Sequence, residues 1–374
     1  MRFSISSTVL SNNLTILSKV ISSKNSMAIL DCFLFEIQDG QLSITASDSE
    51  NVMKTTSQLD SNDGNGRFAV LARTILDAVR ELPEQPLTFE VDFDTFAVRV
   101  LYQNGMYNFM AQNAEEYPVI QFAPTEVTTI TIDAGVLLNN ITRSIFATAQ
   151  EELRPVMNGI YFDITPDCIA IVASDGSKLV RNRNFTVKSE QATSFILPKK
   201  PASLLKNVLS KDGGDVVIQF DDRSAVISFA AGVLTCRLIE GRYPNYNSVI
   251  PQNNPNQLRI DRKALLSTLR RVMPFASESS QLVRIKVEPG HVELSSEDID
   301  FATSAVETLV CEYEGMPMAI GFKGSGLSEI LNNIDCEEVV IELADPSRAG
   351  VVTPAQQPEN EEVLMLIMPM LLND

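Results

Sequence analysis

Few side chains in this sequence are of a type and spacing that could support catalysis. The one histidine, His291, stands at the start of an expected strand, and we interpret it as structural or merely exposed. Acid pairs such as Glu151-Glu152, Asp221-Asp222 and Glu361-Glu362 fall in apparent turns, where carboxylates are more often solvated than catalytic. No serine or cysteine has an identifiable base partner. The sequence therefore favours a binding protein over an enzyme.

Cofactor and metal motifs are also missing. There is no G-x-x-x-x-G-K-[ST] loop, and the glycine cluster at 321–326 more often eases a strand into a helix. The five cysteines lie far apart without a C-x-x-C arrangement, as is typical of buried thiols in a reducing compartment. We expect no cofactor and no metal. Without a signal-peptide core or a membrane-length apolar run, we also expect a cytoplasmic protein with no membrane partner.

A short motif recurs at nearly even spacing. Ala-Ser-Asp ends an apolar strand-like run at 46–48 and again at 173–175, and Ser-Glu-Asp follows a similar run at 296–298. The copies are 127 and 123 residues apart, which indicates three copies of one domain in the 374-residue chain. We place these domains at 1–121, 128–250 and 256–374.

Each copy has the same predicted order of elements: strand, helix, strands, second helix and closing strands. This order is typical of an α+β domain with antiparallel sheets. Apolar residues at helical spacing predict the helices within 7–24, 72–81, 133–150, 198–211, 261–273 and 322–334. Connectors rich in Pro and Asn lie near 119–127 and 245–257. Because the chain stops where a third connector would begin, we expect its last strand to lie beside open surface.

Charge is segregated by secondary structure. The chain as a whole carries −18. The six helical segments hold 14 basic and 5 acidic residues, however, which leaves the remainder at −27. Cationic helices on an acidic body are what a surface that meets phosphates would show, although Lys and Arg are also good helix formers on any solvated face. In the segment 261–273, Lys263 and Arg270 are expected to point away from the apolar stripe.

Two places depart from the internal symmetry. The central copy follows its Ala-Ser-Asp with Gly176, where the other copies have Ser49 and Ile299. Glycine permits a bend or a close approach, although an ordinary turn would explain it equally well. The second is the chain end, where residues 363–367 predict a buried strand that Pro369 must end. A specific site could have been added at either place.

Four motifs together resemble the bacterial DNA sliding clamp, the beta subunit of DNA polymerase III: ASDGSKL at 173–179, MNG at 157–159, GRYPNY at 241–246 and MPM at 368–370. The resemblance covers the whole chain. It implies the DNA clamp fold and a head-to-tail homodimer that closes into a six-domain ring. It also implies a processivity factor in DNA replication, with duplex DNA passing through the ring without sequence readout.

The resemblance further implies three sets of site residues. A pocket for extended peptides from the polymerase, the clamp loader and repair proteins would comprise Met157, Ser174, Gly176, Ser177, Lys178, Leu179, Pro244, Val249, Leu366, Ile367, Met368, Pro369, Met370 and Leu371. Residues facing DNA would be Lys24, Arg73, Arg80, Arg154, Lys199 and Lys200. The dimer interface would use Tyr107, Phe109, Pro274 and Phe275.

Two other functions remain open at this stage. A multidomain peptide-binding scaffold that never meets DNA would share the repeats and the pocket, but it would not need the cationic helices. A carboxylate-dependent hydrolase would need the acid pairs, for which the sequence offers no substrate.

Overall fold

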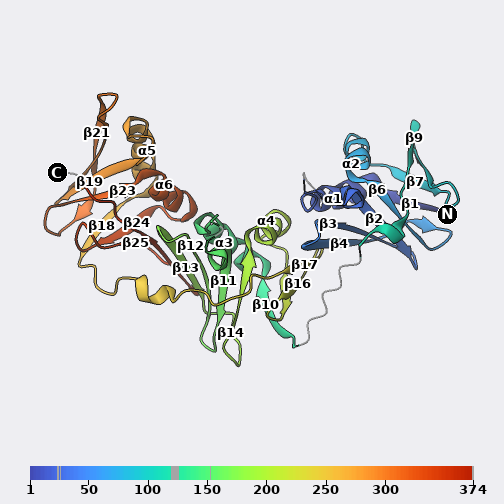
Figure 1. The fold of residues 1–374 in the computed structure, drawn as a ribbon, viewed down its shortest axis with the longest axis horizontal. Helices are drawn as coiled ribbons and strands as arrows, with labels where there is room; N and C mark the ends of the chain where they lie inside the picture. Colours follow the sequence, from blue (N-terminus) through green and yellow to red (C-terminus); the bar gives the residue numbers. More distant parts are fainter. Residues whose placement is uncertain (23–24, 26, 119–125, 152, 373–374) are drawn as a thin grey trace. The chain divides into compact units, whose positions relative to one another are not determined.

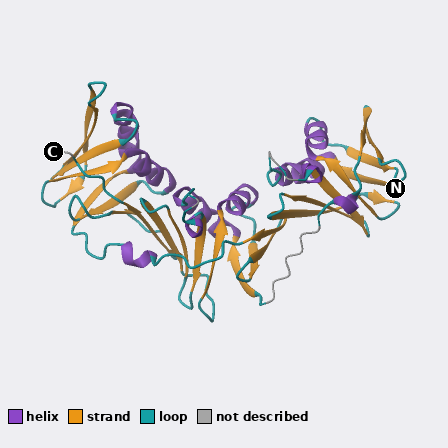
Figure 2. Cartoon of the chain, in the orientation of Figure 1, coloured by secondary structure: helices purple, strands orange, loops and turns teal. Residues whose placement is uncertain are grey.

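The computed structural model describes the chain except residues 23–24, 26, 119–125, 152 and 373–374 (Figure 1). The described residues divide into two compact units. The first unit consists of Met1–Leu138 and Lys200–Leu238, and the second consists of Asn139–Lys199 and Ile239–Asp374. Figure 2 shows helices packed on antiparallel sheets, as the sequence predicts.

The first unit contains two sheets. One has the strand order β5-β1-β7-β8-β9, and the other has the order β10-β15-β16-β17-β4-β3-β2-β6. Their bounds are β1 (Arg2–Ser6), β2 (Cys32–Gln38), β3 (Gln41–Ser47), β4 (Asn51–Gln58), β5 (Ser61–Asn62), β6 (Gly66–Leu71), β7 (Pro86–Val91), β8 (Ala97–Tyr102), β9 (Gly105–Met110), β10 (Thr128–Asp133), β15 (Asp215–Phe220), β16 (Ser224–Phe229) and β17 (Gly232–Arg237).

Helices α1 (Ser7–Ser18) and α2 (Ala72–Arg80) pack together in the first unit, and α1 also contacts β3 and β4 (Figure 1). The side chain of Ser6 caps α1 by accepting the N–H of Val9. Leu10, Leu14 and Leu17, which recur at helical spacing, are buried, as expected of the apolar face of the helix. The helix begins at Ser7 and ends at Ser18, within the predicted segment 7–24.

The second unit also contains two sheets, ordered β14-β11-β12-β13-β26-β25-β24-β18-β22 and β21-β20-β19-β23. Their bounds are β11 (Gly159–Ile164), β12 (Ile169–Ser174), β13 (Lys178–Asn184), β14 (Thr193–Pro198), β18 (Asn256–Asp261), β19 (Leu282–Glu288), β20 (His291–Asp298), β21 (Thr303–Val310), β22 (Glu312–Tyr313), β23 (Met318–Lys323), β24 (Glu338–Leu343), β25 (Gly350–Pro354) and β26 (Glu361–Ile367).

Helices α5 (Arg262–Val272) and α6 (Gly324–Asn333) pack together in the second unit. On α5, Leu265 and Leu269 are buried while Lys263 and Arg270 are exposed, as the helical spacing predicts. Helices α3 (Ala134–Ser144) and α4 (Lys199–Val208) span the boundaries between the two units in sequence. Among the described residues, no helix is long and apolar enough to cross a membrane.

Neighbouring copies of the repeat share continuous sheets. In the first unit, β4 of copy one pairs with β17 of copy two, with Val52 opposite Thr235. In the second unit, β13 of copy two pairs with β26 of copy three, with Leu179 opposite Leu366. The last strand of the chain is therefore flanked by β13 and β25, and the expectation that it borders open surface was wrong. The pattern of buried residues identified β26 as a strand, but it could not identify the strand's partner.

Candidate peptide-binding site

The turn between β12 and β13 forms one wall of the predicted pocket. Gly176 has a φ of 90°, a left-handed conformation that glycine adopts without strain. Asp175 Oδ1 accepts the N–H groups of Ser177 and Lys178 at 2.9 and 3.0 Å. The hydroxyl of the buried Ser174 donates to the carbonyl of Lys178 at 2.8 Å. These bonds fix the turn that carries Gly176 and Ser177 at the surface.

Lys178 connects this turn to α6. Its Nζ lies 2.5 Å from Asp175 Oδ2 and 3.2 Å from Glu329 Oε2. Burial opposes the ionisation of Asp175, but hydrogen bonds from Lys178 and Ser177 outweigh it and hold the pKa of this carboxyl below its usual value. Burial likewise opposes the charged form of Lys178, but the two carboxylates raise its pKa. The side chain of Lys178 is 11% exposed, so its charge is largely satisfied within the protein.

The chain end forms a second wall. Beyond β26, the N–H of Met368 donates to the carbonyl of Ser177 at 2.8 Å, and the N–H of Met370 donates to the carbonyl of Gly321 at 2.8 Å. Pro369 lies between these two bonds and has no N–H of its own, which is why the ladder of β26 ends at Ile367. The backbone is held, yet Met368 and Leu371 remain 43% and 85% exposed. The tail therefore presents apolar side chains on a fixed backbone.

Two tyrosines at the end of copy two pack against the strands of the candidate site. Tyr243 stacks on Tyr161 with ring centroids 4.6 Å apart, and Tyr246 donates its hydroxyl to Asp163 at 2.7 Å. Both connector tyrosines pack in one buried cluster with Leu179 and Leu366. The predicted pocket residues Pro244 and Val249 lie on either side of Tyr246 and are exposed. The stacked tyrosines thus anchor the exposed residues beside them.

The structure places the fourteen predicted pocket residues in three environments. Ser174, Leu179 and Leu366 are buried beneath the surface just described, and Met157 is buried in the 3-10 turn η4 (Pro155–Met157). Ile367 points instead into the core of copy three. The remaining residues are exposed or half-buried: Gly176, Ser177, Lys178, Pro244, Val249, Met368, Pro369, Met370 and Leu371.

The residues predicted to face DNA have varied surroundings. Arg73 is exposed and lies 3.7 Å from Asp77, and Arg80 is also exposed. Lys199 is half-buried, and Lys200 forms an ion pair with Asp48. Lys24 lies outside the described residues.

Arg154 lies beside the pocket turn. It is exposed, and a Cβ added at Gly176 would come within 3.2 Å of Arg154 Nη1. The structure therefore brings together Arg154 and Gly176, which the sequence assigned to two different surfaces. Glu329 was not predicted at all, because nothing in its local sequence links it to Lys178. Tyr243 and Tyr246 could have been found from the Tyr-Pro step and the paired tyrosines of GRYPNY.

The residues predicted for the dimer interface lie at edges of the two units. Tyr107 and Phe109 are half-buried on β9, an end strand of its sheet. Pro274 and Phe275 are exposed in the 3-10 turn η6 (Met273–Phe275), which contacts the end strand β21. Within the described part of the chain, His, Cys, Asp and Glu side chains do not gather in threes where they could hold a metal ion.

The fold and the site define a class of protein: a binding scaffold of repeated α+β domains joined through continuous sheets. Family models for the N-terminal, central and C-terminal domains of the DNA polymerase III beta subunit match residues 1–121, 131–245 and 247–371. The chain belongs to the DNA polymerase III beta subunit family.

Curated relatives support this membership along the whole chain. The beta sliding clamp of Haemophilus influenzae is 27% identical, with 100% of each chain covered. The beta sliding clamp of Caulobacter vibrioides is 26% identical over 98% of this chain and 99% of its own. Among solved structures, the Thermotoga maritima beta subunit has a TM-score of 0.90 at 26% identity, and a Pseudomonas aeruginosa sliding clamp has a TM-score of 0.93 at 24% identity, each covering 100% of both chains.

Membership of this family identifies the general function of the chain. The chain is a sliding clamp of DNA replication, a processivity subunit that works with DNA and DNA polymerase III and is not itself catalytic. The resemblance, the α+β clamp fold and the non-enzymatic function predicted from the sequence are thereby confirmed.

Proposed function

We propose that two copies of this chain join head to tail into a cytoplasmic ring that encircles duplex DNA without reading its sequence. We further propose that extended peptides of the polymerase catalytic subunit, the clamp loader and other replication and repair proteins bind the pocket around Gly176 and Met368. The boundaries 1–121, 128–250 and 256–374 are our proposal for the three domains. The observation that carries the homodimer is a strand register that recurs at both internal junctions.

Equivalent residues in the three copies follow from the sheets themselves. In each copy, the residue before the second helix ends a strand, and three successive strand pairings can be followed from it across the sheet. They lead to Val52 in copy one, Leu179 in copy two and Ser304 in copy three, so these three residues are equivalent. The same procedure, begun at the residue before the first helix of each copy, gives the register of the last strand. It makes Asn108 of copy one, Thr235 of copy two and Leu366 of copy three equivalent.

At both internal junctions the equivalent residues face each other: Val52 lies opposite Thr235, and Leu179 lies opposite Leu366. A third junction of the same kind would place Ser304 opposite Asn108. These residues lie on β21 and β9, which are end strands of their sheets. An end strand presents unpaired backbone groups that can pair with another chain. A second copy of the chain therefore supplies the matching partner for each strand.

Exposed apolar side chains line both strands. Met106 is 56% exposed on β9, and Val306 is 60% exposed on β21. The recurrent register sets these two residues directly opposite each other, so pairing would bury both. Long exposed edges with apolar residues are a hazard for a monomer, and closure of the ring would remove the hazard.

The proposed DNA contact rests on the cationic helices. Our candidates on these helices are Arg73, Arg80, Lys199 and Lys200, and Arg154, which precedes η4, is a further candidate among the described residues. Charge contacts to phosphates carry no sequence information, and they are individually weak enough for sliding. Retention then comes from topology, because leaving the duplex requires ring opening or a free DNA end.

A retention experiment tests this topological mechanism. After loading by the clamp loader, the protein should stay on a closed circular duplex and leave within seconds once a restriction enzyme cuts the circle. A catalytically inactive restriction enzyme serves as the control. Equal retention on cut and uncut DNA would refute the encircling ring.

A proline substitution tests the homodimer. The N–H of Ala111 donates inward to Phe96, so alternate residues of β9, including Asn108, direct their N–H groups outward. Asn108→Pro removes an outward donor, and proline is tolerated on an edge strand whose N–H faces solvent. The variant should fold but sediment at the mass of one chain, while Asn108→Ala should still form a dimer. A dimeric Asn108→Pro would argue against pairing through β9.

A further inference from the structure

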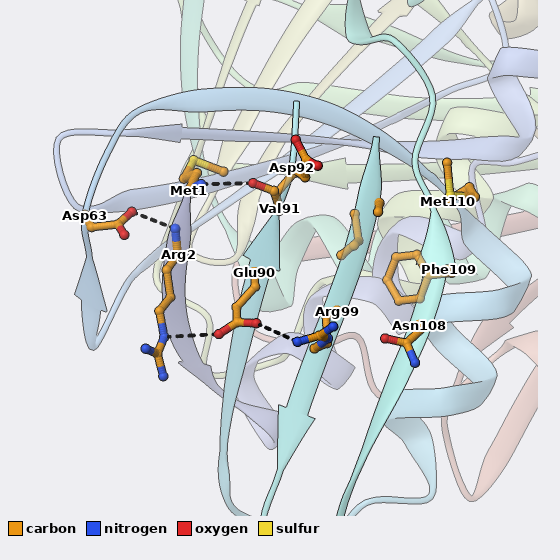
Figure 3. A pocket seen from close by; sticks show the side chains of 12 residues that line it. Met1, Arg2, Asp63, Glu90, Val91, Asp92, Arg99, Asn108, Phe109 and Met110 are labelled. Atoms are coloured by element: carbon orange, nitrogen blue, oxygen red, sulfur yellow. Dashed lines mark hydrogen bonds and ion pairs between the residues drawn. The ribbon is translucent and has the colours of Figure 1, made fainter. Parts of the chain in front are cut away.

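A pocket of about 690 Å³ opens in copy one, on the sheet that ends in β9 (Figure 3). Its floor is a row of charged side chains on adjacent strands, with Glu90 between Arg2 and Arg99. Met1 lies on the β1 side of the pocket, where the N-terminal amine donates to the carbonyl of Val91 at 2.9 Å, and Met110 lies on the β9 side (Figure 3). Met110 is 65% exposed, so the β9 side of the pocket offers apolar surface to solvent.

Copy three carries an unusual hairpin tip. Asp48, Asp175 and Asp298 each accept the N–H groups of the second and third residues that follow, so the three turns begin alike. The turns in copies one and two close after four residues, 48–51 and 175–178. In copy three the equivalent turn, counted in the same way with its closing pair Asp298 and Thr303, runs over the six residues 298–303.

The two additional residues change the chemistry of the tip. Ile299 and Phe301 are 84% and 79% exposed, whereas the shorter turns carry polar or small residues, Ser49 and Glu50 in copy one and Gly176 and Ser177 in copy two. Large apolar side chains at a solvent-exposed tip favour a contact with another surface. Among the described residues within the second unit, nothing covers either side chain to more than about a quarter of its area.

We propose that Ile299 and Phe301 of one copy pack into the pocket of copy one in its dimer partner, against Met110. This contact rests on the proposed homodimer and adds to it an apolar anchor beyond the strand pairing. The pocket in Figure 3 thereby has an occupant supplied by a second copy of the chain.

The internal junctions indicate where the tip must lie. The N–H of Arg237 donates to the carbonyl of Glu50 in the first junction, and the N–H of Met368 donates to the carbonyl of Ser177 in the second. Both bonds join the turn of one copy to the end of the last strand of the next. Their counterpart in the dimer joins the N–H of Met110 to the carbonyl of Ala302. The tip is thereby placed at the end of β9 that borders the pocket.

The face of the sheet also agrees. Residues opposite each other on paired strands project to the same face, so Ser304 and Asn108 would share a face. Asn108 lies two residues before Met110 on that face, and both residues line the pocket. The N–H of Ala302 donates to the carbonyl of Ile299 at 3.3 Å, which closes the turn that leads into β21. The tip therefore adjoins a strand whose Ser304 would lie on the pocket's side of the joined sheet.

The double variant Ile299→Ser, Phe301→Ser tests the contact in the full-length protein. Sedimentation over a dilution series should show a dimer dissociation constant raised at least about tenfold, because two large apolar side chains no longer leave water on association. Met316→Ser is the matched control, since Met316 is 79% exposed in the same unit but lies outside the tip. It should leave the constant unchanged.

A crosslink provides the second measurement. Phe301→Cys combined with Met110→Cys should give a covalent dimer with a short bismaleimide, and each single variant should give far less. An unchanged dissociation constant together with absent crosslinking, while Asn108→Pro still yields monomers, would overturn the tip contact and leave the homodimer standing. If Asn108→Pro also remains dimeric, the proposed interface fails and the tip contact fails with it.

Discussion

The two internal junctions use one backbone arrangement with different side chains. In the first junction, β4 and β17 pair over Asn51–Lys54 and Val233–Cys236, and Lys200 reaches Asp48 from a side chain that is 42% exposed. In the second junction, β13 and β26 pair along their whole length. The second junction also holds an ion pair at 2.6 Å between Arg143 and Glu361, which are 11% and 9% exposed.

The two junctions share their strand pairing and differ in the features around it. Backbone pairing in one register suffices to join two copies, because both junctions have it. Within the described part of the chain, the second junction alone has the glycine turn, the stacking of Tyr243 on Tyr161 and the tail that continues past β26. The proposed site therefore combines additional features of one junction with the strand register that both junctions share.

Removal of Glu361 should have the largest effect on the second junction. Its carboxylate accepts hydrogen bonds from Arg143 at 2.6 Å and from Asn140 at 3.1 Å. Glu361→Ala leaves the Arg143 charge buried without its partner, and we expect the free energy of unfolding to fall by about 3–5 kcal/mol. Urea denaturation measures this loss. Glu361→Gln, which keeps a hydrogen-bond acceptor, should lose less stability. A loss below about 1 kcal/mol for Glu361→Ala would show that the buried ion pair does not make the second junction more stable than the first.

Truncation after Ile367 should separate binding from assembly. It removes the exposed side chains of Met368 and Leu371 together with the bond from Met370 to Gly321. We expect the affinity for a clamp-binding peptide to fall at least tenfold, or about 1.4 kcal/mol, while the dimer persists. Fluorescence anisotropy with a labelled peptide gives the affinity. Truncation after Leu372 is the control, and equal affinities for the two truncations would refute the tail as a wall of the pocket.

Exchange of the turn residues should sharpen the comparison further. Ser49 and Gly176 are equivalent and have φ angles of 79° and 90°. Gly176→Ser places a side chain in this left-handed conformation and should lower the free energy of unfolding by about 1–2 kcal/mol. Ser49→Gly relieves the same strain and should raise it by about 0.5–1 kcal/mol. Thermal denaturation of both variants measures whether the free energy of unfolding falls for Gly176→Ser and rises for Ser49→Gly. Changes in the same direction would contradict the proposed backbone strain.

The smallest effect is expected at Lys200. Lys200→Met removes a half-exposed ion pair and should lower the free energy of unfolding by about 0.2–1 kcal/mol at pH 7. Burial opposes the ionisation of Asp48, but hydrogen bonds from Lys200 and Asn51 hold its pKa below the usual value. A depressed carboxyl pKa stabilises the fold above about pH 4, and this contribution is lost as pH falls through the folded value. Urea titrations should therefore show the variant and the wild type converging below about pH 4, and a constant gap would exclude the ion pair as the cause.

The sequence was sufficient for the elements but not for their partners. Helical spacing located α5 and its exposed Lys263 and Arg270, because burial of one face shapes the local pattern of residues. The partner of a strand leaves no such local trace. β26 pairs with β13, which lies far away in the sequence, and alternation of buried residues is the same for any partner.

The candidate site divides in the same way. Gly176 and Met368 stood out because they break the repeat, and the structure joins their segments through the bond from Met368 to Ser177. Glu329 could not be anticipated, because its contact with Lys178 depends on the packing of α6 against the turn. Arg154 was assigned by position alone, and its approach to Gly176 depends on side-chain geometry.

The enclosure of Lys178 by Asp175 and Glu329 would give the two proposed interactions of the clamp different responses to ionic strength. A lysine already satisfied by two carboxylates adds little attraction for an incoming charge, so the proposed peptide binding at this turn would rest on apolar contact and should change little as salt is added. Phosphate contacts weaken steeply over the same range, because each one releases condensed counterions. A rise in salt should thus loosen the grip on DNA while the protein cargo stays attached.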